Sequence, residues 1–305
     1  MGPANSGFSL VEILVVSVLL ALIVFALMGV FSSTQRAFRA SVTQSGVLEG
    51  GRAAADLIAS DLARATPAYD KFYNLSQPFQ NLANVPGAVN FFVTTNAAFY
   101  QPLVQSLPGS SVSRTNQLQW FFVLSRQNTE WIGVGYIVNS ASSQYFYPLY
   151  RFYGITNTTV SPIVLYSNFV YDVNNGCINM SHVLDGVVHL VVRAYDPNGV
   201  WIQPNEYFLT GHSVTNTYFA PAVPIQETSL MMVSNALPAS VEVQLGVMED
   251  RAVARCQAMS SGQVFQQDGT PSFTPQWSYM QSLAGRVHVF RQRVTIENVD
   301  PTIYQ

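Results

Sequence analysis

A chain of 305 residues can bury one or two hydrophobic cores, but only 10% of these residues are charged, against about a quarter in an average soluble domain. The net charge is −3, and the 14 basic residues are scattered, which argues against a basic patch for nucleic acid. Apolar residues make up 49%, partly in an N-terminal segment, and the rest of the composition is rich in Tyr, Phe, Val, Ser and Asn, a mix that favours a β-rich domain outside the cytoplasm.

The first element in chain order is an apolar run near the N-terminus. Residues 13–31 carry no charge, and these 19 residues span about 28 Å as a helix, close to the ~30 Å hydrocarbon core of a membrane. A secretory signal peptide is disfavoured, because no basic residue precedes the run and no small-residue cleavage site follows it. A plain membrane anchor fits the length but leaves Glu12 unexplained, since a carboxylate near lipid is costly and usually functional.

The order Gly7-Phe8-Ser9-Leu10-Val11-Glu12, followed at once by the apolar run, resembles the processing site of type IV prepilins and type II secretion pseudopilins. The resemblance implies that a prepilin peptidase removes residues 1–7 by cutting after Gly7. It also implies that the new amine, that of Phe8, is methylated. Glu12 would then be the fifth residue of the mature chain.

The resemblance further implies that Glu12 pairs with a Phe8 amine, within the chain or on a neighbouring subunit. Low dielectric strengthens such charge pairing, so that it can set the register between subunits. Alternatively, Glu12 has no pairing role and its side chain simply extends to the lipid headgroups. One departure from the family is the leader, which has no basic residue, while Arg36 and Arg39 lie beyond the far end of the run.

A helical pattern continues after the apolar run, and it predicts one helix from Phe8 to about Ala65. Residues 8–31 would be the membrane and assembly segment, and residues 32–66 its amphipathic continuation. Glycines at 46, 50 and 51 predict a weak point, and Pro67 predicts the end. The apolar face is expected to carry Phe38, Val42, Ser45, Leu48, Ala55, Ile58 and Leu62.

Residues 67–305 are predicted to form a globular domain of antiparallel strands. Strands are expected at 89–94, 117–124, 131–138, 145–153, 186–195, 239–248 and 286–296, and a short helix at 249–259. Residues 204–238 are rich in Asn, Thr and Pro and are expected to be a surface excursion. Because no βαβ alternation appears, the predicted class is α+β: a long N-terminal helix packed on an antiparallel, β-rich, pilin-like domain.

Three segments carry a narrower resemblance. HLVVRAYDPNGVW (189–201) and ALPASVEVQL (236–245), followed by a terminal strand, are similar to minor pseudopilins of the J class and to W-type minor pilins. DLIASDLARATP (56–67) resembles the end of the first helix in those proteins. Major pilins are usually shorter, so the length also favours a minor subunit.

No motif predicts an enzyme. The sequence lacks HExxH, paired-cysteine, P-loop and GxSxG motifs, and nothing in it orients Cys177 and His182 as a nucleophile pair. His189 alternates with Val and Arg and is expected to be a hydrogen-bonded structural residue. Asp172, Asn174 and Asn175 are expected to form a turn in preference to a calcium loop. Hence no catalytic residue, metal or cofactor is assigned.

Cys177 and Cys256 are a candidate disulfide if the domain lies in an oxidising compartment. The bond would close a loop of about 80 residues and contribute about 4 kcal/mol in the chain-entropy model. Two buried free thiols are equally compatible with the sequence.

Two functions remain. The first is a minor pilin or pseudopilin that, after cleavage and N-methylation, joins or primes a type IV pilus or a type II secretion pseudopilus. Its implied partners are the prepilin peptidase, other minor and major subunits, the inner-membrane assembly platform and the lipid bilayer, with no nucleic acid. It would cross the inner membrane once, with its domain in the periplasm. The second is an uncleaved, single-pass periplasmic binding module.

Overall fold

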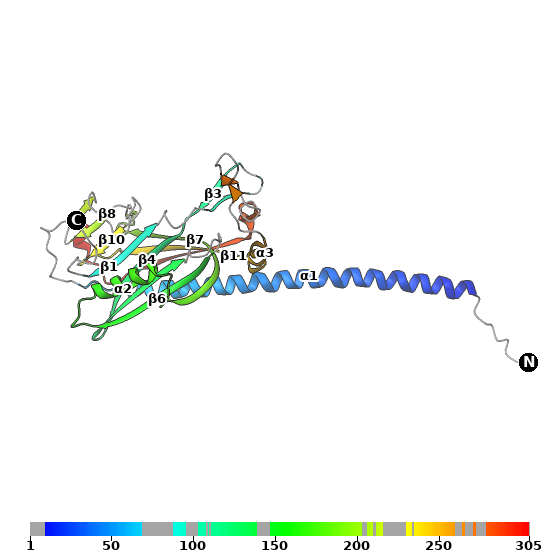
Figure 1. Ribbon diagram of the computed structural model, residues 1–305, viewed down its shortest axis with the longest axis horizontal. Coiled ribbons are helices and arrows are strands. Elements are labelled where there is room, and N and C mark those ends of the chain that lie inside the picture. Colours follow the sequence, from blue (N-terminus) through cyan, green and yellow to red (C-terminus); the bar gives the residue numbers. More distant parts are fainter. Residues whose placement is uncertain are drawn as a thin grey trace, which may run out of the picture. The chain divides into compact units, whose positions relative to one another are not determined.

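A computed structural model of the chain shows the fold (Figure 1). It describes residues 10–68, 88–95, 103–107, 109, 111–138, 147–202, 206–209, 212–215, 230–233, 235–259, 264–265, 271–272 and 279–304. The chain divides between Gly46 and Val47 into two compact units. The predicted α+β class is confirmed, because a long N-terminal helix precedes an antiparallel, strand-rich domain.

Helix α1 runs from Leu10 to Ala63. The helical backbone continues through the glycines at 46, 50 and 51, which were expected to weaken it. The helix ends before Pro67, since a residue that precedes proline avoids helical angles. Ala65 forms an isolated bridge with Ser125, and the Thr66 amide donates to the Leu124 carbonyl at 3.0 Å. These bonds tie the end of α1 to the sheet.

Fourteen strands and several short helical segments follow in the described residues. The strands are β1 (Val89–Thr95), β2 (Leu103–Ser106), β3 (Ser113–Asn116), β4 (Gln119–Gln127), β5 (Glu130–Val138), β6 (Tyr147–Asn157), β7 (Ser181–Tyr195), β8 (Glu206–Leu209), β9 (His212–Thr215), β10 (Leu230–Val233), β11 (Ser240–Met248), β12 (Val264–Phe265), β13 (Pro271–Ser272) and β14 (Val287–Thr295). The helical segments include the α-helices α2 (Ile163–Asn174) and α3 (Asp250–Gln257) and the 3₁₀ turns η2 (Ala284–Arg286) and η3 (Pro301–Tyr304).

Ten of the described strands form one sheet in the order β14-β11-β7-β6-β5-β4-β1-β10-β8-β9. Every neighbouring pair is antiparallel except β10 and β8. The long strand β7 pairs with β6 through its first half and with β11 through its second half. Where β6 departs, the start of β4 approaches: Leu118 forms a parallel bridge with Leu190. The sheet is therefore strongly curved between β4 and β7.

Both faces of the central strands are buried. On one face Ile58 and Leu62 of α1 pack with Phe121 and Tyr136. On the other face α2 covers β4, β5 and β6 with Phe169 and its neighbours (Figure 1). This double burial explains why β4 and β5 read as nearly continuous apolar runs without alternation.

The structure corrects two predictions in the globular unit. Residues 163–174 form helix α2, whereas part of this segment was expected to be a turn. Residues 204–238 were expected to be a surface excursion, but β10 within them is buried and pairs with β1 inside the sheet. Only the described part of that segment supports this correction.

The buried face of α1 also differs from the prediction. Ile58 and Leu62 are buried as expected, but Phe38, Val42 and Leu48 are exposed. Burial begins at Val47 and continues one turn later at Gly51 and Ala54. The face that packs on the sheet therefore includes the predicted Ala55, Ile58 and Leu62, with Val47, Gly51 and Ala54 beside them.

Gly51 is required where α1 lies against β14. A Cβ at this position would overlap the ring of Phe290, whereas a Cβ at Gly46 would meet nothing within 4 Å. We expect Gly51→Ala to lower the free energy of unfolding by about 1–3 kcal/mol through overpacking. Gly46→Ala, the matched control, should leave it unchanged or raise it by up to about 1 kcal/mol through helix propensity. Urea unfolding of the full chain in detergent measures both, and equal effects would contradict the α1–β14 contact.

Candidate functional site

The apolar run of α1 presents its side chains to the surroundings on all sides. In the first unit every described side chain is exposed, and the large apolar residues of 10–31 are between 49% and 81% exposed. By length and composition this is the helix in the described chain that could cross a membrane, and no residue of its most apolar window is buried. A core helix of a soluble protein would bury much of this surface, because each Å² of apolar area left in water costs about 25 cal/mol.

Hydroxyl groups in and next to the apolar run are hydrogen-bonded within the helix. Ser17 donates to the Leu14 carbonyl at 2.9 Å, and Ser32 donates to the Gly29 carbonyl at 2.9 Å. Thr34 donates to the carbonyl of Val30 at 3.0 Å. A polar group that enters hydrocarbon must find its partner inside the protein, so these local bonds suit a lipid environment.

Glu12 lies in the first turn of α1 and is exposed. It is the single acidic residue of the helix before Glu49. A carboxylate in this turn is favoured by the partial positive charge of the helix N-terminus. Gly7 and Phe8, the predicted cleavage and methylation positions, lie outside the described residues, so their relation to Glu12 stays a prediction.

A buried ion pair holds α1 in the globular unit. Arg151 on β6 donates to both carboxylate oxygens of Asp61, from Nε at 2.8 Å and from Nη2 at 2.9 Å. The Tyr136 hydroxyl on β5 donates to Asp61 Oδ2 at 2.5 Å. The Asp61 side chain is only 7% exposed. Three hydrogen bonds from two strands therefore fix this turn of the helix.

The pKa shifts in this group follow from its burial and its charges. Burial and then the hydrogen bond and charge of Asp61 raise the pKa of Tyr136. Burial alone lowers the pKa of Arg151, but its hydrogen bonds to Asp61 and the carboxylate charge outweigh burial and raise it. Arg151 stays charged and Tyr136 stays protonated across the physiological range, so the group is an anchor and does not switch.

The candidate disulfide is not formed. Cys177 is buried in the cluster between α2 and the sheet, whereas Cys256 is buried in a separate cluster around α3. Burial raises the pKa of each thiol to about 11, and the charge of Asp172 adds to the effect at Cys177. Both cysteines are therefore protonated at neutral pH.

The imagined Cys177–His182 pair has other contacts in the structure. His182 Nε2 lies 2.9 Å from Asp185 Oδ1, and the imidazole meets the ring of Tyr150 edge-on. His189 accepts a hydrogen bond from the Gln117 amide at 3.1 Å, as expected for a structural histidine. Burial, together with the charge of Arg114, lowers the pKa of His189 to about 4, so it is neutral at physiological pH.

The expected turn at Asp172, Asn174 and Asn175 is instead the last turn and the C-cap of α2. Asp172 is buried and accepts a hydrogen bond from the Asn179 side chain at 2.7 Å. This side chain closes the helix end and does not line an ion loop. Among the described residues no group of three or more His, Cys, Asp or Glu could hold a metal ion.

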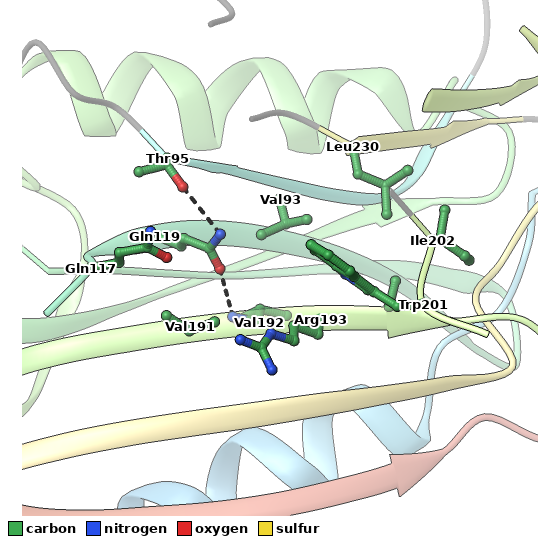
Figure 2. A pocket seen from close by; sticks show the side chains of 11 residues that line it. Val93, Thr95, Gln117, Gln119, Val191, Val192, Arg193, Trp201, Ile202 and Leu230 are labelled. Atoms are coloured by element: carbon green, nitrogen blue, oxygen red, sulfur yellow. Dashed lines mark hydrogen bonds between the residues drawn. The ribbon is translucent and has the colours of Figure 1, made fainter. Parts of the chain in front are cut away.

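A pocket of about 260 Å³ opens where β4 approaches β7 (Figure 2). Gln119 lines the pocket and its side chain links two strands. Its Nε2 donates to Thr95 Oγ1 on β1 at 3.1 Å, and its Oε1 accepts from the Val192 amide on β7 at 2.6 Å. Trp201 and Arg193 stand at one side of it. The sequence contained no signal for this pocket, since its lining comes from five separate segments.

No family model, curated protein or solved structure matches this chain. Its function is therefore inferred from its own residues.

Proposed function

We propose that the chain is a minor pilin or pseudopilin that joins or primes a type IV pilus or a type II secretion pseudopilus after its leader is removed. The observation that carries the proposal is the exposed apolar helix with Glu12 in its first turn. The Gly7-Phe8 pair directly ahead of it is the expected cleavage position.

Exposure on all sides of residues 10–31 supports two successive environments. Lipid covers the apolar surface of a single subunit, and the helices of neighbouring subunits can cover the same surface after assembly. Packing between apolar helices is weakly directional, because lipid and leucine side chains are equally apolar. A charge pair between Glu12 and a Phe8 amine would fix the register of one subunit's helix against the next.

The proposed partners follow from this role: the prepilin peptidase, other minor and major subunits, the inner-membrane assembly platform and the lipid bilayer. The chain would cross the inner membrane once and hold its β-rich domain in the periplasm. It would act by assembly and carry out no chemistry. The J class of minor pseudopilins is the proposed subgroup.

Gly7→Leu tests the processing step. We expect this variant to remain a full-length precursor in the membrane, because a bulky side chain would not fit where the peptidase accepts glycine. Ala4→Leu, inside the leader but away from the predicted cut, is the matched control and should be processed. Intact-mass spectrometry of the purified chains measures the outcome: wild type should begin at Phe8 and carry one methyl group.

A wild-type chain that begins at Met1 or Gly2 in assembled material would contradict the proposal. It would favour the second function, an uncleaved membrane-anchored binding module.

A further inference from the structure

Three arginines and one glutamate lie side by side on the sheet face that points away from α1. Glu242 on β11 is in register with Arg193 on β7 and with Arg293 on β14. Arg291 lies two residues before Arg293 on the same side of β14, because side chains alternate along a strand. We call Arg193, Glu242, Arg291 and Arg293 the arginine row.

The row contains three positively charged side chains and one carboxylate, that of Glu242. Its side chain is 4% exposed, and Oε2 lies 2.6 Å from Arg291 Nη2. Gln244 donates to Oε1 at 2.8 Å, whereas Arg193 Nη1 is 4.0 Å away. Arg291 and Gln244 thus already satisfy this carboxylate, and the row keeps two positive charges in excess in a chain whose net charge is −3.

Two of the guanidinium groups are held against aromatic rings. Arg193 Cζ lies 5.8 Å from the centre of the Trp201 ring, and Arg293 Cζ lies 4.1 Å from that of Tyr195. Stacking occupies the face of a guanidinium and leaves in-plane N–H groups for an acceptor. On Arg293 the Nε–H already donates to Ser240 Oγ at 3.0 Å, which leaves the terminal N–H groups. The Arg193 side chain is 44% exposed and Arg293 is exposed as well, so a ligand can reach both.

The row is continuous with the pocket near β4. Arg193 and Trp201 line that pocket as well, and Val93, Ile202 and Leu230 give it apolar walls (Figure 2). One surface therefore combines a hole for an apolar side chain with guanidinium groups beside it.

We propose that the arginine row and this pocket bind an extended acidic segment of a partner protein. An apolar side chain of the segment fills the pocket, and carboxylates next to it along the segment pair with Arg193 and Arg293. Arginine matches the planar, two-oxygen geometry of a carboxylate. A peptide can offer both an apolar side chain and carboxylates, which a polyphosphate chain cannot. The inference does not depend on the proposed function of the apolar helix.

The test is fluorescence anisotropy with the full chain in a non-ionic detergent. The probe is a short labelled peptide in which leucine and glutamate alternate. We expect it to bind wild type, more weakly at high salt, and to lose about tenfold in affinity with Arg193→Gln, since an exposed arginine at an interface centre is worth roughly that much. Thermal unfolding of Arg193→Gln should match wild type, because Glu242 keeps its closer partners.

Arg126→Gln is the matched control. Arg126 is exposed and its Cζ lies 5.4 Å from the Trp131 ring centre, outside the row, so the peptide should bind this variant as it binds wild type. Equal losses in both variants, or no binding to wild type, would overturn the proposal. So would equally tight binding of a leucine–glutamine peptide, which lacks charge. Tighter binding of polyphosphate or single-stranded DNA would show a general anion surface and would also overturn it.

Discussion

Glu12→Leu is expected to prevent incorporation of the chain into the proposed pilus or pseudopilus, while the chain still inserts into the membrane. Removal of a charge near lipid lowers the cost of insertion, and the proposed cut at Gly7-Phe8 is unchanged, so insertion and processing should survive. Incorporation should fail, because the amine of the processed chain would lose the carboxylate with which it is proposed to pair. Each ~1.4 kcal/mol of lost pairing lowers the equilibrium tenfold, so the tagged variant recovered with sheared filaments or partner subunits should fall at least about tenfold.

Two further variants of the same helix sharpen this test. Glu12→Asp keeps the charge one methylene short and should assemble to an intermediate level. Ser17→Ala, the control, removes a polar group that bonds only locally to the Leu14 carbonyl and should assemble as wild type does. If Glu12→Leu also assembles normally, Glu12 is a headgroup anchor and the pairing mechanism is wrong.

Asp61→Ala is expected to give the largest loss of stability in the globular unit. It leaves Arg151, whose side chain is 20% exposed, without its carboxylate, and leaves the Tyr136 hydroxyl without its acceptor. Loss of one partner from a buried pair costs about 3–5 kcal/mol. Because Arg151 is partly exposed, we expect the free energy of unfolding to fall by about 3 kcal/mol. Urea unfolding of the full chain in detergent measures it.

Asp56→Ala is the control for Asp61. Asp56 is an exposed acidic residue on the same helix, and its removal should change the unfolding free energy by less than about 0.5 kcal/mol. The double variant Asp61→Leu with Arg151→Met should recover part of the loss, because it removes both charges together. Similar losses for Asp56→Ala and Asp61→Ala would contradict the anchoring role.

The strands with strong local signals could be predicted from the sequence. Segments rich in aromatic and β-branched residues at 131–138 and 239–248 became β5 and β11 within one residue. Helix α2 could not, because its sequence IVLYSNFVYDVN is composed of the same residue types as those strands. In the structure Phe169 packs over Gly135 of the sheet and Leu165 over Gly133, and this burial stabilises a helix that local preference does not predict. Tertiary contact overrode local preference there.

The residues of the candidate sites also differ in whether the sequence could predict them. Gly7, Phe8 and Glu12 lie within six residues, so their pattern is visible in the sequence. The partners of Asp61 lie 75 and 90 residues away, and no local spacing points to them. The arginine row comes from three strands, and its members meet only through the register of the sheet. Long-range pairing of this kind has no signature in a single sequence.

One hydrogen bond near the end of α1 has a consequence for the order of synthesis. The Asn298 side chain donates to the Ala65 carbonyl at 3.1 Å, and Val294 and Ile296 share a cluster with Ile58 and Leu62. These contacts join residues that leave the ribosome more than 200 positions apart. If residues 10–31 enter lipid as proposed, the nascent chain is tethered to the membrane before β14 exists. Anchoring therefore comes first in time, and the domain that holds the end of the helix closes only after residues 294–298 have left the ribosome.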